Sequence, residues 1–352
     1  MGKANGVSNR VTIEQVAQAV GVAKSTVSHA FSGQRPISAS VRRRIFEAAE
    51  RLNYRPHYAA QALASRRTMN IGVLIRRMTD HFCPAHLQAV EEAAAKRGYR
   101  LTLGITGDDP EKMRTYLESF SNGQADGVLV HTATVSEEVI ADLARQGYPV
   151  ATPLRIIPGY EELCPIAIDL GTTFARLLEY LYSLGHREFG FIMGLPSDVP
   201  ERHQQILRFI DEKGLSHSDD RMVANLVSME AAESATMALL NRCPQITAVV
   251  SSNDELAFGA MVAAHGCGLR VPDDLTITGV DDVPIGRYCI PSLTTVRIPI
   301  PEISTAEVNN LVDRIEGKPS ASMTRVRTEL LIRGSSGPPR TRDARKTQEN
   351  TP

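Results

Sequence analysis

The sequence lacks any apolar run long enough to cross a membrane. No stretch of its 352 residues approaches the roughly 18 to 20 consecutive apolar residues of a transmembrane helix, and the N-terminus, MGKANGVSNR, has no apolar core of a secretory signal. We therefore expect a cytoplasmic protein with no membrane partner. Because 42% of the residues are hydrophobic and 22% are charged, the composition excludes a fibrous or wholly disordered chain and suits two or three globular domains.

Cysteine is scarce, and the short motifs that support catalysis are missing. The five cysteines lie far apart, without a C-x-x-C pair or the His spacing of a zinc site: Cys83, Cys164, Cys243, Cys267 and Cys289. The sequence also has no G-x-x-x-x-G-K-[ST], no G-x-G-x-x-G after a strand and no G-x-S-x-G. We therefore expect reduced, mostly buried thiols, no disulfide framework, no metal site or cofactor, and no catalytic residues.

The formal net charge of −1 hides an uneven distribution of charge. Residues 1–68 hold eleven Lys or Arg and three Asp or Glu, whereas the rest of the chain holds 28 basic and 37 acidic residues. A small, strongly basic segment joined to an acidic body is the pattern of a nucleic-acid-binding module attached to another domain.

The basic segment has the pattern of three short helices. We expect a helix over 13–20, a second over 24–31 after a tight glycine-containing turn, and a third from the N-cap Ser38 to about Leu52. Two short helices joined by such a turn predict a helix-turn-helix. The helical segment that follows, near 57–65, is too short to persist alone, so we expect it to order only against a partner.

From residue 70 onward, short β-rich runs alternate with amphipathic helices, which predicts parallel sheets covered by helices. The expected strands are 71–76, 100–105, 127–131, 150–154, 166–169, 188–193, 221–226, 246–251 and 275–280. The expected helices are 84–97, 110–122, 136–146, 172–184, 200–213, 230–241, 254–265 and 301–316. A last β-rich run, 324–332, precedes a polar tail, 335–352, that we expect to be disordered, as we do residues 1–10.

Several phrases of the sequence match one protein family in order and spacing. The segment TIEQVAQAVGVAKSTVSHAFSGQRPISASVRRRIFEAAERLNYRP spans 12–56. The body contains GHREFGFIMG (185–194), SSNDELAFGA (251–260), GLRVPDDLTITGVDD (268–282) and PSLTTVR (291–297). From Val11 to about Gly334 the chain resembles the LacI/GalR family of bacterial transcription regulators.

The resemblance implies an all-α helix-turn-helix DNA-binding head and an α/β, periplasmic-binding-protein-like body of two doubly wound parallel-sheet subdomains. It also implies a homodimeric repressor that binds a palindromic operator in double-stranded DNA and a small effector in the cleft between the subdomains. The expected divisions are 11–56 for the head, 57–69 for the hinge helix and linker, 70–168 with 298–323 for the N-terminal subdomain, and 169–297 with 324–334 for the C-terminal subdomain.

The resemblance implies DNA contacts from a set of side chains in the head and hinge: Thr12, Lys24, Ser25, Thr26, Ser28, His29, Arg35, Tyr54 and Leu63. In this family the second helix enters the major groove, where Lys24, Ser25 and His29 would read bases and the other polar side chains of that helix suit phosphates. Leu63 would wedge into a minor-groove step. The alternatives are a merely solvated polar face and packing of Leu63 against the body.

The resemblance also implies effector contacts in the body, from His81, Phe82, Arg202, Asn253 and Asp281. An arginine, an amide and a carboxylate can each make paired hydrogen bonds to neighbouring hydroxyl groups. A small polar effector is therefore expected. The alternative is that Asn253 and Asp281 only cap helices or bridge loops.

Departures from the family argue against a simple neutral hexose as the effector. Leu154, Ile298 and Val227 stand where relatives carry polar or stacking side chains. Several cationic side chains would suit an anionic effector if they line the cleft: Arg76, Arg77, His81 and Arg155. A sugar, a sugar acid and a related carboxylate therefore stay open.

Dimerisation is expected through apolar positions of the body, although the same positions suit ordinary core packing. They are Leu87, Val90, Ala94 and the segments 222–229 and 255–262. The competing function is that of a cytoplasmic solute-binding receptor without an operator. The strongly basic head argues against it, because a receptor has no use for nucleic-acid contacts.

Overall fold

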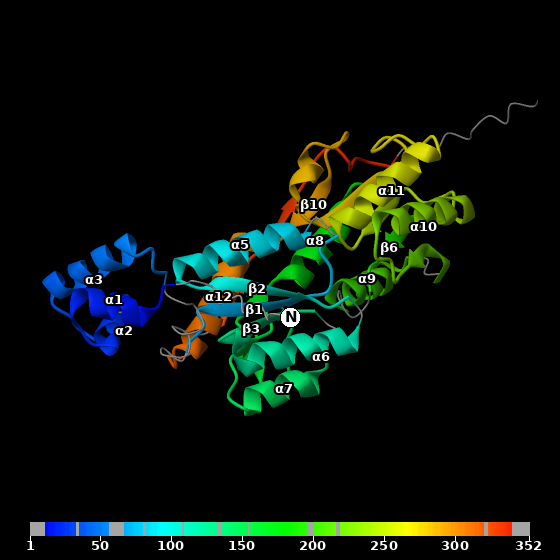
Figure 1. Cartoon of the computed structure of the whole chain (residues 1–352). Helices are drawn as coiled ribbons and strands as arrows, with labels where there is room; N and C mark the ends of the chain where they lie inside the picture. The colour runs from blue at the N-terminus through cyan, green and yellow to red at the C-terminus, as the bar shows by residue number, and fades with distance from the viewer. Residues whose placement is uncertain are drawn as a thin grey trace, which may run out of the picture.

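The computed structural model describes residues 11–32, 35–55, 67–79, 82–107, 109–132, 135–153, 155–195, 200–215, 219–319 and 323–339. A three-helix head stands apart from an elongated body (Figure 1). The predictions for residues 1–10, the hinge helix with Leu63, His81, Leu154 and residues 340–352 lie outside the described residues. Within the described ranges, no helix is both long and apolar enough to span a bilayer.

The head consists of three helices: α1 (Ile13–Val20), α2 (Lys24–Ser32) and α3 (Ala39–Arg51). α1 ends at Gly21, whose φ of 72° lies in the left-handed region and allows its N–H to bond the last carbonyls of the helix. The apolar positions of the three helices meet in one small core: Val16, Ala17, Val20, Val27, Ala30, Ile45, Ala48 and Ala49. The arrangement confirms the predicted helix-turn-helix, with α3 packed against α1 and α2.

The first lobe of the body, here called the N-lobe, is built on a parallel sheet of order β2-β1-β3-β4. Its strands are β1 (Asn70–Ile75), β2 (Arg100–Ile105), β3 (Gly127–His131) and β4 (Val150–Ala151). Side chains alternate across β1, so Ile71, Val73 and Ile75 face one side while Leu74 faces the other. Helices therefore cover both faces of this sheet.

Two pairs of helices cover the N-lobe sheet (Figure 1). α5 (Phe82–Lys96) and α12 (Ile300–Ile315) pack together on one face, and α6 (Pro110–Ser119) and α7 (Glu137–Arg145) pack on the other. α12 begins about 150 residues after the end of β4, the last strand of this sheet along the chain. One face of the N-lobe core therefore depends on a late segment of the chain.

The second lobe, the C-lobe, has a six-stranded sheet of order β12-β10-β9-β8-β6-β7. Its strands are β6 (Phe189–Ile192), β7 (Met222–Val223), β8 (Ala248–Ser251), β9 (Thr276–Asp281), β10 (Thr294–Arg297) and β12 (Glu329–Leu331). Only β12 runs antiparallel to its neighbour. α8 (Leu170–Ser183) and α9 (Pro200–Lys213) cover one face, and α10 (Met229–Arg242) and α11 (Asp254–Gly266) cover the other.

The chain passes between the lobes three times. The passages follow β5 (Ile166–Ile168), join β10 to α12, and return through β11 (Thr324–Val326), which pairs with β5 in parallel. The predicted β-rich run 324–332 is therefore two strands, β11 and β12, in different sheets. β10 was not expected, because its fully buried Thr294 and Thr295 do not give the apolar pattern of an inner strand.

The prediction of a disordered tail from Ser335 is wrong for its first residues. Ser335 is fully buried, its hydroxyl donates to the Ile277 carbonyl at 2.6 Å, and it accepts from the Thr294 N–H at 2.8 Å. The segment is polar, but the Ser335 hydroxyl makes hydrogen bonds with backbone groups of β9 and β10. A polar composition therefore hid an ordered segment.

The start of α2 offers a test of local helix stability. Ala23 precedes α2 and has no side-chain oxygen for a cap, whereas Ser38 accepts from the Val41 N–H at 3.4 Å ahead of α3. We expect Ala23→Ser to stabilise α2 by about 0.5 to 2 kcal/mol and Ser38→Ala to destabilise α3 by a similar amount. Hydrogen exchange of the head amides in the full chain measures both. Equal protection in Ala23→Ser and the parent would contradict the expectation.

Candidate functional site

α2 presents one polar face to solvent. Lys24 and Ser25 are exposed, and Thr26, Ser28 and His29 are partly exposed. The opposite face of the helix, with Val27 and Ala30, is buried in the head core. The predicted base-reading residues of α2 therefore lie together on the side of the helix away from the rest of the head.

Two side chains of this face have contacts that limit how they can meet DNA. Lys24 pairs with Glu14 of α1, and this hydrogen bond lowers the pKa of the Glu14 carboxyl. The Nδ1 atom of His29 is buried and has no hydrogen-bond partner among the described residues. A base contact from His29 would therefore use its Nε2 atom.

The other predicted DNA-contacting residues of the head differ in exposure. Thr12 and Arg35 are exposed, and the Thr12 N–H is held by the Gln15 side chain at 2.8 Å. Tyr54 is half-buried, with its ring centroid 5.8 Å from that of Phe31, and burial raises the pKa of its hydroxyl. Tyr54 thus has a packing role in the head whatever its role toward DNA.

In the C-lobe, the predicted effector residues gather at the carboxyl-terminal edge of the sheet. Arg202 of α9 is buried and donates from Nη1 to the Ser252 carbonyl at 2.6 Å, directly before Asn253. Asn253 accepts from the Leu256 N–H at 2.9 Å as the N-cap of α11. Asp281 ends β9, next to β8, with a φ of 124°. Open α/β sheets bind ligands at this edge.

Phe82 reaches the same region from the N-lobe. It is the first residue of α5, it packs against the C-lobe cluster that contains Ile298, and its ring centroid lies 5.6 Å from that of His86. Because that cluster also includes Ile303 of α12, Phe82 packs where the two lobes meet.

The departures from the family pattern have different surroundings. Ile298 is buried in the C-lobe cluster, whereas Val227 is 40% exposed. Arg155, considered above as a partner for an anion, donates to the Val135 carbonyl at 2.6 Å and pairs with Glu137 at 3.4 Å. The charge of Arg155 is therefore used within the N-lobe.

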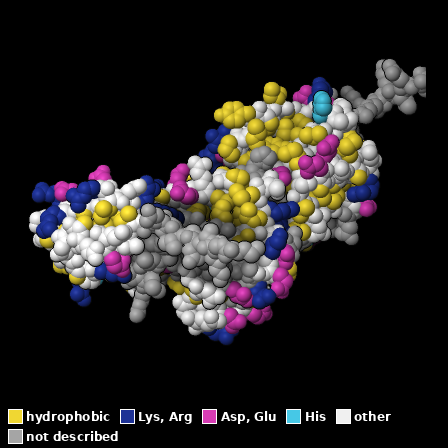
Figure 2. All heavy atoms as spheres, in the orientation of Figure 1, with side chains coloured by type: hydrophobic (Ala, Val, Ile, Leu, Met, Phe, Trp, Pro, Cys, Tyr) yellow, Lys and Arg dark blue, Asp and Glu magenta, His cyan; other side chains and the backbone are white. Residues whose placement is uncertain are grey.

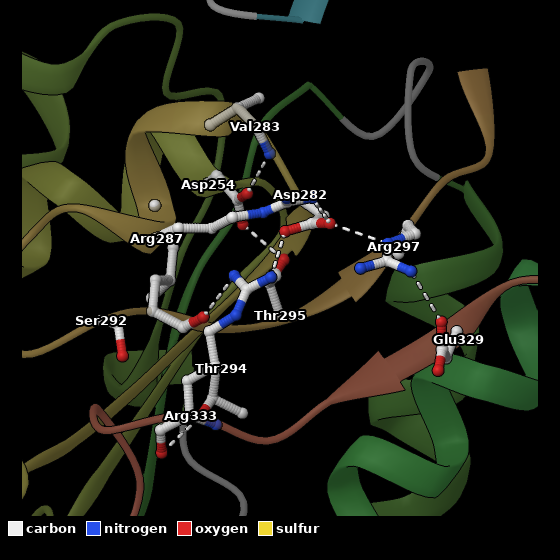
Figure 3. A network of polar contacts seen from close by, with 12 residues as sticks. Asp254, Asp282, Val283, Arg287, Ser292, Thr294, Thr295, Arg297, Glu329 and Arg333 are labelled. Atoms are coloured by element: carbon white, nitrogen blue, oxygen red, sulfur yellow. Dashed lines mark hydrogen bonds and ion pairs between the residues drawn. The ribbon is translucent and has the colours of Figure 1, made fainter. Parts of the chain in front are cut away.

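A buried acid, Asp254, lies directly behind this edge. It is fully buried, accepts from the Val283 N–H at 2.9 Å and accepts from the Thr295 hydroxyl at 2.6 Å (Figure 3). A Cβ on Gly279 would lie 2.3 Å from the Asp254 carboxylate, so only glycine fits there. Burial raises the pKa of Asp254 to about 7, with hydrogen bonds from Thr295 and Val283 opposing the shift.

The neighbouring acid, Asp282, has the opposite electrostatic character. Its carboxylate accepts from Arg297 Nε at 2.8 Å, from Arg287 Nη2 at 3.0 Å and from Arg333 Nη2 (Figure 3). Burial alone would raise its pKa, but the three guanidinium hydrogen bonds outweigh burial and lower it. Sequence reasoning missed both acids, because their partners lie up to 41 residues away for Asp254 and 51 residues away for Asp282.

The described residues also include one group of side chains with the donor atoms of a metal site. His86, His131 and Glu307 bring their ligand atoms within 4.8 Å of one another in the N-lobe. The sequence predicted no metal site from short spacings, and these residues are far apart in the chain. No short motif could have signalled them.

A helix-turn-helix head on a two-lobed α/β body defines a class of DNA-binding regulators with a ligand-binding body. Two family models match the chain: "Bacterial regulatory proteins, lacI family" over residues 12–57 and "Periplasmic binding protein-like domain" over 178–336. The transcriptional regulator GalS of Salmonella typhimurium is 30% identical over 93% of this chain and 91% of its own. The chain therefore belongs to the LacI family of bacterial regulatory proteins.

Other comparisons agree on the family and the fold. The ribose operon repressor of Halalkalibacterium halodurans is also 30% identical, over 92% of this chain and 96% of its own. A crystal structure of the lac repressor dimer bound to operator and the anti-inducer ONPF superposes with a TM-score of 0.79, at 23% identity, over 94% of this chain and all of that chain. At that identity the likeness establishes the fold.

The raised pKa of Asp254 predicts a pH dependence. From about pH 3.8 to about pH 7 the folded chain holds a proton that the unfolded chain releases, so this contribution to stability is full below pH 3.8 and is lost as the pH rises toward 7. Asp254→Asn should remove this loss, because its Oδ1 can accept from the Val283 N–H while its NH2 donates to the Thr295 hydroxyl oxygen, and it does not titrate. Urea unfolding from pH 5 to 8 should show the variant gaining on the parent as the pH rises. Parallel curves would refute the assignment.

Proposed function

We propose that this protein is a sequence-specific transcription regulator that represses by binding a palindromic operator as a homodimer. The observation that carries the proposal is the polar face of α2 in a head whose apolar core is already satisfied. That face is free to enter the major groove, and the excess of Lys and Arg in residues 1–68 suits phosphate contacts. Of the relatives named above, GalS is a transcriptional regulator and the ribose operon protein is a repressor, which supports this proposal.

We further propose that a small polar effector binds between the lobes. Arg202, Asn253 and Asp281 would hold its hydroxyl or carboxylate oxygens from the C-lobe, with Phe82 and His81 on the N-lobe side. A sugar, a sugar acid or a related carboxylate suits this set of donors and acceptors. The buried guanidinium of Arg202 favours ligands with paired oxygens.

The body holds the described end of the linker firmly, which gives the effector a route to the head. The Thr68 N–H and the Met69 N–H donate to the two carboxylate oxygens of Asp126 at 2.6 and 2.8 Å. Arg67 donates to the Ile315 carbonyl at the end of α12, at 3.2 Å. Residues 67–69, the end of the hinge segment, therefore move with the N-lobe, so an effector that repositions the N-lobe would reposition them, and the coupling would be reciprocal.

An apolar surface of the C-lobe is our candidate for the dimer contact. Figure 2 shows apolar side chains gathered on the body near β10 and α11. Tyr288 and Ile290 are 79% and 97% exposed, and Ile285 and Ile332 are also exposed. The positions expected on α5, namely Leu87, Val90 and Ala94, are instead buried in the N-lobe core. Large exposed apolar side chains that lie close together are typical of a homodimer interface.

This function needs no catalytic residues, and we assign none. The protein would act in the cytoplasm, and at the nucleoid when the operator is bound, because the DNA lies there. A solute-binding receptor without an operator is the second candidate function. The DNA selection described in the next paragraph separates the two.

Selection from a randomised DNA pool at fixed salt tests the operator proposal. We expect a palindrome to be enriched, and we expect Leu63→Ala to weaken binding through the central step. His29→Ala should cost about 1 to 3 kcal/mol and relax the preference at one base position in each half-site. Lys96→Ala, at an exposed position on α5, is the matched control and should leave selection unchanged. No enriched sequence, with or without sugars and carboxylates, would favour the receptor.

Substitution at Arg202 tests the effector proposal. Arg202→Lys keeps the positive charge but loses the planar fork, so a ligand that changes operator affinity should need about 10 to 100 times the concentration. Operator binding without ligand should be unchanged. Arg208→Lys, at an exposed position on the same helix, is the control. An unchanged ligand response in Arg202→Lys would remove Arg202 from the site.

A further inference from the structure

Three elements of the N-lobe bring a carboxylate and two imidazoles together. His86 lies on α5, His131 ends β3 and Glu307 lies on α12. Glu307 Oε1 is 2.8 Å from His86 Nε2, and Glu307 Oε2 is 3.3 Å from His131 Nε2. The two imidazole rings meet edge to face with centroids 4.4 Å apart. The carboxylate therefore lies between two histidines that come from different elements.

The three side chains lie in the interior of the N-lobe, and two of their polar atoms make no hydrogen bond to the described residues. Glu307 is fully buried, and the side chain of His131 is 11% exposed. Although they lie 3.3 Å apart, Glu307 Oε2 and His131 Nε2 are not in hydrogen-bonding geometry, and neither has another hydrogen-bond partner within the described part of the chain. Glu307 Oε1 is paired with His86, but a buried carboxylate oxygen without a partner, such as Oε2, destabilises the fold. An apolar side chain would fill the position at no such cost, so the acid indicates a bound group.

The donor atoms of the group suit metal ligation. One nitrogen of each imidazole and one carboxylate oxygen of Glu307 all lie within 4.8 Å of one another. A bound cation would offset the burial of the carboxylate.

We propose that His86, His131 and Glu307 bind one divalent transition-metal ion, with Zn²⁺ as the best match. Ligand bonds of about 2.0 to 2.2 Å in tetrahedral geometry place neighbouring ligand atoms about 3.3 to 3.5 Å apart. The 3.3 Å between Glu307 Oε2 and His131 Nε2 matches this spacing, whereas the 2.8 Å between Glu307 Oε1 and His86 Nε2 is a hydrogen-bond length that would lengthen by about 0.5 Å around an ion. Two imidazoles and one carboxylate are typical zinc ligands, and three protein ligands leave the fourth position for water or another donor.

The ion would join three elements that pack but are not linked along the chain. It would tie α12 to α5 and to the end of β3, and α12 is the helix whose last turn holds Arg67 of the linker. Zinc should therefore raise the melting temperature of the N-lobe, because an ion that binds only the folded state stabilises it by mass action.

The test uses full-length protein without a polyhistidine tag, freed of metal by chelation. Calorimetric titration with Zn²⁺ should show one site per chain, and Co²⁺ should give the visible absorption of a tetrahedral site. Glu307→Gln and His131→Gln should each weaken Zn²⁺ binding more than about 100-fold, since loss of a ligand exceeds the 10- to 100-fold effect of an outer-shell partner. His265→Gln, which removes an exposed histidine at the end of α11, is the matched control.

Anomalous diffraction at the zinc edge provides a measurement that does not depend on the stability of the variants. A peak between His86, His131 and Glu307 in crystals of the parent protein would support the site. Three results would overturn the proposal: no such peak, Zn²⁺ binding that survives both ligand substitutions, or binding lost equally in His265→Gln. The cluster would then be a buried hydrogen bond between His86 and Glu307 with His131 packed beside it.

Discussion

The arrangement of the C-lobe edge depends on the hydrogen bonds that the Asp282 carboxylate accepts from arginines. These arginines lie on three separate segments: the short helix Pro284–Arg287, β10 and the chain beyond β12. Removing one partner would leave a buried charge with fewer hydrogen bonds, which costs far more than an exposed ion pair contributes. Asp282 follows Asp281 directly, and both residues have positive φ values. The position of the proposed effector ligand Asp281 thus depends on its neighbour.

The same interaction reaches the passages between the lobes. Arg297, which donates to Asp282, also pairs with Glu329 of β12 at 2.9 Å, and it stands three residues before α12 begins. The pKa of Asp254 is raised and that of Asp282 is lowered, although the two acids lie in one network. The difference follows from their partners, because guanidinium groups surround Asp282 whereas a hydroxyl and a backbone N–H meet Asp254. Charge at this edge is therefore set by contacts rather than by burial alone.

Local pattern sufficed to predict some parts of the protein and not others. The head helices and strands such as β2 and β3 were placed correctly, because their periodicity, caps and turns are local signals. β10 and the ordered Ser335 were missed, because their polar side chains are satisfied by partners about 40 residues away. The cluster around Glu307 was missed for the same reason. Contacts between helices that are far apart in the chain produce no recognisable spacing of residues in the sequence. The effector residues could be placed only through the resemblance to the family.

The contribution of α12 and Ser335 to the two lobes has a consequence for the order in which the protein can fold during synthesis. The head is complete once its three helices have left the ribosome, since its core uses no later residue. The N-lobe sheet has to wait for α12 to cover one of its faces, and β9 and β10 lack their last backbone partners until Ser335 emerges. A nascent chain therefore carries a finished head on a body with exposed apolar sheets for most of its translation, and such surfaces are prone to aggregate or to bind chaperones.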